Sequence, residues 1–159
     1  MNHTYGGIEC FGPVNITIGN FCSLADGITA ITHGHNASWV STYPFGAMAA
    51  WKTKTPGHPK TWDITIGNDV WIGKDVVLMA NVGDGAIIGA GSVVRNEIPP
   101  YTIAFGNPCE VKRYRFRHDQ IEDLLKIAWW DWPVEKIHKF IPLLCSNDID
   151  TFIREVNNE

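Results

Sequence analysis

The feature that most constrains the fold is a six-residue repeat between Lys60 and Pro100. An aliphatic residue opens each hexad, Gly usually follows, and a small or aliphatic residue stands four places later. The opening residues are Ile66, Ile72, Leu78, Val82, Ile88 and Val94, and the later ones are Val70, Val76, Ala86, Ser92 and Ile98. A period of six fits neither a helix nor an alternating strand, so it predicts a solenoid in which each hexad is a short strand plus a corner. We expect the repeated apolar residues to point inward and stack from coil to coil.

The same spacing starts near the N-terminus, between Gly12 and Ala30. We expect the apolar residues there to point inward as well: Ile16, Ile18, Cys22, Leu24 and Ile28. Cys22 is therefore interpreted as a small buried hydrophobe. One irregularity interrupts the repeat, because Leu78 and Val82 are four residues apart where six is expected. Either a corner is tightened at Ala80–Asn81, or the register shifts around it.

The repeat disappears between Ile31 and Thr61. This stretch contains three prolines, several aromatic residues and the histidines His33, His35 and His58. We interpret it as a loop that leaves the prism. A loop of roughly 30 residues in a small domain is usually functional or disordered, and the aromatic content favours a packed, functional loop.

After Pro99–Pro100 the pattern changes to that of helices. Asp119, with Glu122 three residues later, predicts the start of a first helix, Pro133 a second, and Asp148 a third. The expected apolar faces are Ile121, Leu124, Leu125 and Ala128 in the first helix, Val134, Ile137, Ile141 and Leu144 in the second, and Phe152, Ile153 and Val156 in the third. The predicted organisation is a β-helix over residues 1–108, with the loop at about 31–62, and a helical tail over 109–159.

Charge and cysteine content exclude several classes of protein. The net charge of -4 gives no electrostatic footprint for nucleic acid. The four cysteines form no CxxC pair, which argues against a zinc knuckle and against a disulfide framework. Neither a long apolar run nor a basic start followed by an apolar stretch is present, so we expect a cytoplasmic protein with no membrane partner.

Several stretches, inside and outside the hexads, carry a family resemblance over nearly the whole chain. They are Ile18-Gly-Asn-Phe-Cys-Ser, His35-Asn-Ala-Ser-Trp-Val-Ser-Thr-Tyr-Pro-Phe, Ile66-Gly-Asn-Asp-Val-Trp-Ile-Gly, Gly106-Asn-Pro and Trp129-Trp-Asp-Trp-Pro. Together with the hexads they resemble the xenobiotic acetyltransferase branch of the hexapeptide-repeat acyltransferases, which includes streptogramin and type B chloramphenicol acetyltransferases. The resemblance implies a mainly β fold, a left-handed parallel β-helix with about three hexads per turn.

The resemblance also implies a catalytic residue, because His35 falls on the family's catalytic histidine by its spacing to Trp39 and to Ser41-Thr-Tyr-Pro-Phe. Transfer of an acetyl group from a thioester to a hydroxyl needs a base near the acceptor, and imidazole changes protonation near neutral pH. We therefore expect His35 to act as general base. The alternative is an ordinary polar loop histidine.

Other site residues are expected from the same resemblance. Coenzyme A binding is assigned to Trp71, Ala90, Gly91, Ser92, Lys112 and Arg113, and acceptor binding to Trp39, Tyr43 and Phe45. The alternative for Trp71 is packing at a subunit interface. The alternative for the glycines is that they are simply corner residues of the coils. The basic run Lys112, Arg113, Arg115 and Arg117 could equally be a solvated face, and only some of its members could face one ligand.

The leading hypothesis is an acetyl-CoA-dependent acetyltransferase that acts on a hydroxyl of a small acceptor such as an antibiotic or a sugar, assembled as a homotrimer with sites at its subunit boundaries. N-acetylation of an amino sugar is one alternative. A second is a metal-dependent hydratase like the γ-class carbonic anhydrases, since His33 and His35 form an H-x-H pair; without a convincing third ligand beyond a distant His58, we expect no metal. A third is a scaffold without catalytic activity.

Overall fold

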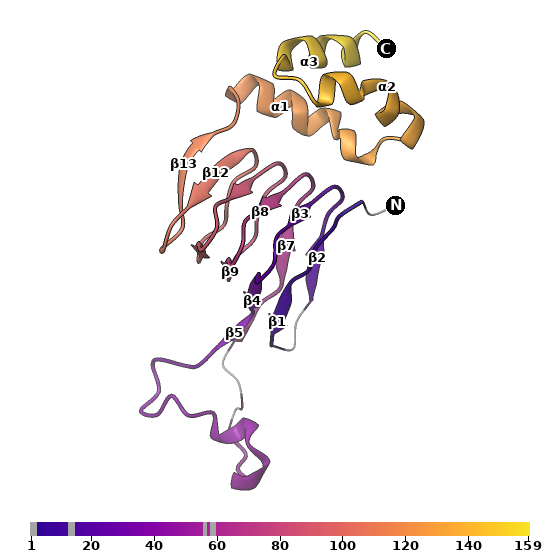
Figure 1. Cartoon of the computed structure of the whole chain (residues 1–159). Helices are drawn as coiled ribbons and strands as arrows, with labels where there is room; N and C mark the ends of the chain where they lie inside the picture. The colour runs from indigo at the N-terminus through magenta and orange to yellow at the C-terminus, as the bar shows by residue number, and fades with distance from the viewer. Residues whose placement is uncertain (1–2, 13–14, 56, 58–59) are drawn as a thin grey trace.

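The computed structural model describes residues 3–12, 15–55, 57 and 60–159, and its short strands wind into a parallel β-helix covered at one side by helices (Figure 1). One sheet contains β1 (Glu9–Phe11), β4 (Thr29–Ile31), β9 (Val77–Leu78) and β11 (Val93–Val94). A second contains β3 (Ser23–Leu24), β8 (Trp71–Ile72), β10 (Ile87–Ile88), β12 (Thr102–Phe105) and β13 (Glu110–Tyr114). The third contains β2 (Ile16–Ile18) and β7 (Ile64–Ile66).

Strand pairing shows how the coils stack. All neighbours in these sheets are parallel except β12 and β13, which are antiparallel. Leu24 pairs with Ile72, Ile72 with Ile88, and Ile88 with Ala104, so one inward position recurs in each successive coil. This regular stacking is the architecture that the hexads predict.

The interior confirms the inward positions. Within residues 66–98, every side chain predicted to point inward is at most 3% exposed: Ile66, Val70, Ile72, Val76, Leu78, Val82, Ala86, Ile88, Ser92, Val94 and Ile98. Cys22, Leu24 and Ile28 are also buried, while Ile16 and Ile18 are half-buried against the same core. Burial of one aliphatic side chain contributes about 1.5–3 kcal/mol, so these rows supply most of the stabilisation of the prism.

The short step from Leu78 to Val82 is a tightened corner, and the register is kept. Val82 bridges to Ile66 on one side and to Ile98 on the other, so all three occupy one stacked position. The prediction that Ile98 stands four places into a hexad opened by Val94 is therefore wrong. Ile98 opens the next coil, because the corner after Val94 is shortened in the same way.

One corner of each coil has a left-handed backbone. Phe21, Asp69, Gly85 and Tyr101 have φ values of 59°, 54°, 66° and 52°, and we call these four residues the corner row. The N–H groups of Asp69, Gly85 and Tyr101 donate to carbonyls of the preceding coil at 2.9, 2.7 and 2.8 Å. The corner row is thus a hydrogen-bonded ridge along one edge of the prism.

A helical cap lies over this ridge. It consists of α1 (His118–Ile127), the short helix η3 (Trp129–Asp131), α2 (Val134–Leu144) and α3 (Ile149–Asn157). Its buried residues form an apolar cluster with Tyr101 of the corner row, namely Ile121, Leu124, Trp130, Phe140 and Phe152. None of the helices formed by the described residues combines the length and the apolar character needed to cross a bilayer.

The cap corrects several expectations about its helices. α1 begins at His118, and the side-chain oxygen of Gln120 accepts from the backbone N–H of Arg117, so Asp119 is not the N-cap. In α2, Val134 and Ile141 are exposed and Phe140 is buried, because the Phe140 ring packs against Trp132 at 5.3 Å. The predicted cap Asp148 is confirmed, since its carboxylate accepts from the N–H of Thr151.

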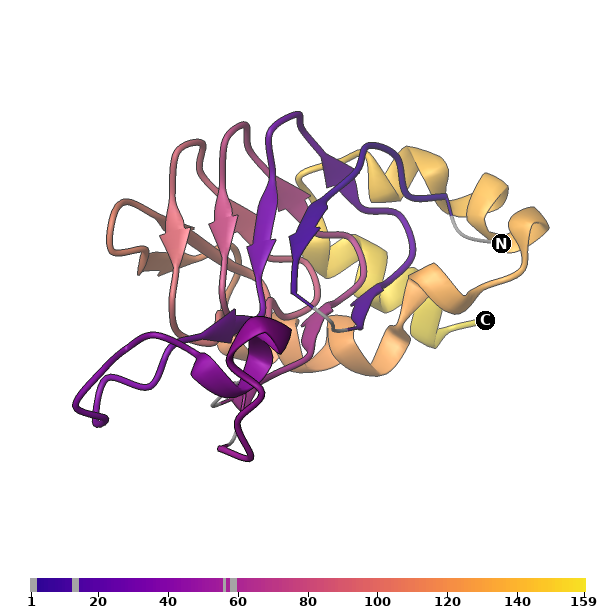
Figure 2. The same cartoon turned by 90° about the horizontal axis from the view of Figure 1, so that it is seen from below.

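Residues 110–114, expected within the helical tail, instead form β13, which covers the open edge of β12. At the other side of the molecule, β5 (His33–Gly34) and β6 (Lys60–Thr61) pair antiparallel as the stem of a long loop. The loop contains η1 (Phe45–Ala47) and η2 (Ala49–Trp51) and projects away from the coils (Figure 2).

A substitution at one inward position should report on this stacking. We expect Ile72→Ala to lower the free energy of unfolding by about 2–5 kcal/mol, because it leaves a cavity between Leu24 and Ile88. Thr65→Ala, at an exposed position of β7, should change it by less than about 0.5 kcal/mol. Chemical denaturation followed by circular dichroism measures both, and equal effects would contradict the inward register.

Candidate functional site

His35 directly follows β5, where the loop leaves its stem. The side chain is exposed, and Nδ1 lies 2.6 Å from the carbonyl oxygen of Thr42. A carbonyl can only accept, so Nδ1 must carry the proton of the neutral ring and donate it to Thr42. Nε2 is then left with its lone pair free to accept a proton, which is the arrangement that a general base requires.

The loop that carries His35 also forms a hollow with mainly aromatic walls. His35 does not line it, but Thr42, its hydrogen-bond partner, stands in sequence between the wall residues Ser41 and Tyr43. The hollow has a volume of about 390 Å³ and is lined by Trp39, Ser41, Tyr43, Phe45 and Thr55. The three residues expected to bind an acceptor therefore lie together. Trp51 braces them from outside, because its ring contacts that of Phe45 at 5.1 Å between centroids. Thr55 is a wall residue that no sequence pattern indicates, since the fold of the loop alone brings it to this hollow.

The other loop histidines occupy different environments. The Nδ1 atom of His33 lies 3.1 Å from the carbonyl oxygen of Phe11, a contact that joins the loop stem to β1. His58, considered as a third metal ligand, lies outside the described residues. Among the residues that the structure describes, no group of three or more His, Cys, Asp or Glu side chains is arranged to hold a metal ion.

A second group of expected site residues lies on the outer face of the second sheet. Trp71 pairs with Ile87, Ile87 with Ile103, and Ile103 with Arg113, so these four side chains form one row across four strands. Trp71 is 55% exposed at one end of the row. Three strand spacings separate it from Arg113, a distance of about 14 Å. The row is an elongated, mainly apolar surface with a cation at its far end.

Ala90 and Gly91 lie at the corner that joins β10 to β11, and Gly91 has a left-handed φ of 68°. Both residues are exposed, and no other atom lies within 4 Å of the position that a Cβ of Gly91 would occupy. A ligand could therefore approach the backbone here. Ser92 is different and corrects the expectation, because it is fully buried and its hydroxyl donates to the carbonyl of Gly89. It stabilises the corner and is not accessible to a ligand.

The basic run divides into two functional halves. Arg115 donates to the carbonyl of Gly85 at 2.6 Å, and Arg117 lies 3.1 Å from Asp119 and 3.0 Å from Asp150. Hydrogen bonds from Arg117 lower the pKa values of both aspartates. Arg115 therefore ties the segment before α1 to the β-helix, whereas Arg117 joins α1 to α3 within the cap.

Lys112 and Arg113 project from the exposed strand β13. Lys112 forms an exposed ion pair with Glu110 at 2.9 Å, and its ammonium lies 5.3 Å from the centre of the Phe105 ring. An exposed pair of this kind is weak, so the charge of Lys112 remains available to an anion.

The two groups of residues do not meet within one chain. The loop carries His35 and the aromatic hollow away from the sheet that carries Trp71 and Arg113 (Figure 1). Within one chain the fold therefore separates the acceptor side from the cation-bearing row.

Comparison with known proteins places this chain among transferases. The family described as "Bacterial transferase hexapeptide (six repeats)" matches residues 63–96. A chloramphenicol acetyltransferase of Escherichia coli is 40% identical over 147 residues, which are 87% of this chain and 70% of the relative. A probable macrolide acetyltransferase of Lysinibacillus sphaericus is 42% identical over 139 residues, which are 82% of this chain and 77% of the relative.

A solved structure agrees in fold. AntD, an N-acyltransferase from Bacillus cereus in complex with dTDP and 3-hydroxybutyryl-CoA, superposes with a TM-score of 0.55 at 20% identity. The match covers 92% of this chain and 69% of that protein. At this identity the likeness supports the β-helix fold and nothing finer.

The orientation of the His35 ring generates a spectroscopic prediction. In the neutral form we expect the proton on Nδ1 and not on Nε2, because the Thr42 carbonyl holds it. Long-range ¹H–¹⁵N correlation spectra at about pH 8, where unperturbed histidines are neutral, distinguish the two tautomers. His138, an exposed residue of α2, serves as the reference. An Nε2-protonated His35 would contradict the geometry.

Proposed function

The chain belongs to the xenobiotic acetyltransferases of the hexapeptide-repeat family, and we propose that it transfers an acetyl group from acetyl-CoA to a hydroxyl of a small acceptor, with His35 as general base. The observation that carries this proposal is the hydrogen bond from His35 to the carbonyl of Thr42, which stands in sequence between two wall residues of an aromatic hollow of about 390 Å³. It supports a base with a defined tautomer in the same loop as a cavity suited to a partly apolar molecule.

The reaction proposed for this geometry needs one base. Nε2 of His35 removes the proton of the acceptor hydroxyl while that oxygen attacks the thioester carbonyl. A backbone N–H near the cleft donates to the developing oxyanion. As the carbon–sulfur bond breaks, the imidazolium returns its proton to the departing thiolate, which leaves as coenzyme A. The acceptor ester is the product, and no acyl-enzyme forms.

The cation-bearing row supports a site for the acetyl donor. Coenzyme A combines an elongated, largely uncharged arm with phosphates at the far end. The apolar row from Trp71 to Arg113 is suited to the arm, with Ala90 and Gly91 allowing close approach to the backbone. Lys112 and Arg113 supply the donors that phosphates need.

The acceptor proposed for the aromatic hollow is an antibiotic-like alcohol. The walls supplied by Trp39, Tyr43 and Phe45 favour stacking against a flat or apolar body, while Ser41 and Thr55 offer hydroxyls for orientation. The names of the relatives, chloramphenicol and macrolide acetyltransferases, point to the same class of acceptor.

A second copy of the chain completes the proposed site. In one chain the loop exposes large apolar side chains, among them Val40, Met48 and Trp51, and Trp71 is also exposed. Apolar surface of this extent favours association. We therefore propose a homotrimer in which the loop of one chain brings His35 to the cation-bearing row of its neighbour. The left-handed sense of the β-helix is part of the same proposal, because it follows from family membership.

Replacing the proposed base should abolish most turnover without loss of structure. We expect His35→Ala to reduce kcat by roughly two to four orders of magnitude, the usual contribution of a positioned general base. Release of free coenzyme A thiol measures it, with chloramphenicol as first acceptor and a panel of other alcohols and amines. His33→Ala is the matched control and should have a much smaller effect. An unchanged kcat in His35→Ala, with an acceptor identified, would refute the assignment.

The role of the cations should appear in the donor kinetics. We expect Lys112→Ala combined with Arg113→Ala to raise the KM for acetyl-CoA more than it lowers kcat, because phosphate contacts stabilise the ground state and the transition state alike. Lys126→Ala, on the exposed side of α1, is the control. A KM equal to that of the unmodified protein would show that the pair is only a solvated surface.

The assembly can be tested by mass and by complementation. Light scattering should give about three times the 17.7 kDa mass of one chain. Mixed trimers of His35→Ala chains with chains that lack Lys112 and Arg113 should recover part of the activity. At some of their subunit boundaries, an intact His35 of one chain meets an intact cation-bearing row of the other. A fully active monomer would exclude a shared site.

A further inference from the structure

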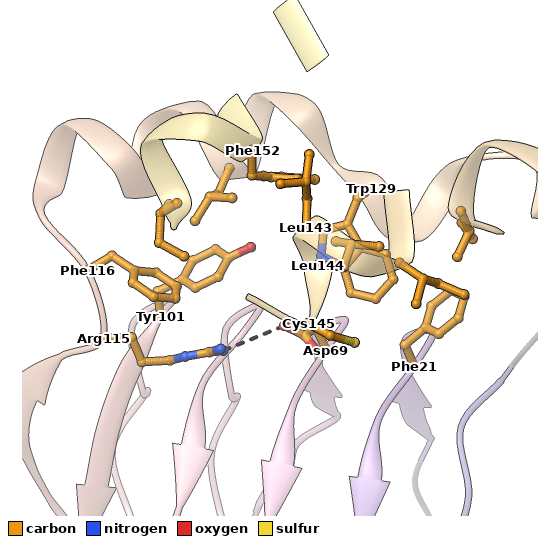
Figure 3. Close-up of a pocket in the computed structure, with 14 residues that line it drawn as sticks. Phe21, Asp69, Tyr101, Arg115, Phe116, Trp129, Leu143, Leu144, Cys145 and Phe152 are labelled. Carbon is orange, nitrogen blue, oxygen red and sulfur yellow. Dashed lines mark ion pairs between the residues drawn. The ribbon is translucent and has the colours of Figure 1, made fainter. Parts of the chain in front are cut away.

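A second cavity lies between the corner row and the helical cap (Figure 3). The loop that carries His35 projects from the other side of the β-helix (Figure 1). The volume of the cavity is about 430 Å³, within the range of about 300–1,000 Å³ typical of small-molecule sites. The proposed acetyl transfer does not use it. The cavity opens to solvent beside Ile141 and Cys145, both of which are exposed.

The walls of this cavity are apolar and come from both parts of the fold. Phe21 lies at one end on the β-helix side, Trp129 packs against it at 4.8 Å, and Leu144 and Phe152 of the cap face the interior (Figure 3). Such walls favour aromatic or alicyclic surface over polar groups.

One polar atom in the cavity has no partner. The side chain of Tyr101 is 2% exposed, and its hydroxyl makes no hydrogen bond to any of the described residues. Figure 3 shows this hydroxyl directed into the cavity and away from the Arg115–Asp69 pair. Buried hydroxyls are almost always hydrogen-bonded, so an unpaired one that points into a cavity indicates a missing partner.

The backbone holds the Tyr101 ring in this position. A Cβ at Gly85 would lie 2.5 Å from Cε1 of Tyr101. The Tyr101 ring therefore lies directly over Gly85, and it fits there only because glycine has no side chain. Arg115 packs against it, with its guanidinium carbon 5.5 Å from the centre of the Tyr101 ring and 5.0 Å from that of Phe116. These contacts restrain the Tyr101 ring, so its hydroxyl stays directed into the cavity and away from other hydrogen-bond partners.

The charged groups of the cavity largely compensate each other. Arg115 and Asp69 lie 3.5 Å apart. Burial raises the pKa of Asp69, and the neighbouring Arg115 opposes that rise. Since each charge already has its counterpart, the cavity offers no unpaired charge to an ionic ligand, and a neutral ligand fits it better.

We propose that this cavity binds a small neutral molecule with an aromatic or alicyclic body and one hydroxyl, and that this hydroxyl accepts a hydrogen bond from Tyr101. The apolar body fills the space between Phe21 and Phe152, and the ligand satisfies the only polar group of the cavity that the described residues leave without a partner. This site is separate from the acetyl-transfer site and does not depend on that function.

Isothermal titration with two probes tests the proposal. 4-Propylphenol should bind, and Tyr101→Phe should weaken it roughly three- to tenfold, the effect of one net hydrogen bond, while leaving the binding of propylbenzene unchanged. Tyr5→Phe is the control, because Tyr5 is 66% exposed and outside the cavity. Absence of binding at millimolar 4-propylphenol, or equal losses for both probes in Tyr101→Phe, would overturn the proposal.

Alkylation by N-ethylmaleimide locates the bound probe. The chain has two exposed cysteines, Cys145 at the mouth of the cavity and Cys10 on β1. Saturating 4-propylphenol should slow modification of Cys145 at least severalfold and leave that of Cys10 unchanged, as measured by mass spectrometry of the tryptic peptides. Protection of both cysteines, or of neither, would place the probe elsewhere and refute the site.

Discussion

Stacking of aliphatic side chains along the axis of the prism is the interaction on which the rest of this structure depends. Its strands have only two to five residues, so no coil could bury its own apolar face. Ile72 becomes fully buried because Leu24 and Ile88 lie above and below it in neighbouring coils. Outward positions and corners do not contribute side chains to this core. A loop, a ligand surface and a helical cap can therefore be attached at these positions.

The corner row shows how one local constraint serves two purposes. A left-handed backbone turns the chain at each position of the corner row, and Gly85 meets that need at little conformational cost. Phe21 and Tyr101 adopt the same conformation with bulky side chains, which is uncommon. Both aromatic rings pack against the cap, and the guanidinium of Arg115 packs on the rings of Tyr101 and Phe116. The apolar contact with the helices offsets the backbone strain, and the imperfect fit between ridge and helices leaves the cavity beside Tyr101.

The separation of the two functional surfaces has a physical logic. The proposed base must be held in one tautomer, and the Thr42 carbonyl holds the His35 ring in this way within the loop. An elongated thioester needs a long, regular surface, which a flat outer face of a β-helix provides. In one chain the loop projects away from that face (Figure 1). The proposed homotrimer would bring the two surfaces together across a subunit boundary, so association is a condition of the proposed activity.

The sequence by itself determined the β-helix core, because a period of six with inward aliphatic residues has few solutions. It also indicated the family, later supported by relatives of 40% identity over most of the chain, and the cap at Asp148. Tertiary structure decided what depends on neighbours distant in sequence. Ser92 matched a ligand-binding pattern but is buried. Of the four cations of residues 112–117, Arg115 bonds to the β-helix, Arg117 bonds within the cap, and Lys112 and Arg113 project from the exposed strand β13. The cavity beside Tyr101 could not be read from the sequence, because it arises where helices meet corners from three separate coils, and only packing brings those residues together.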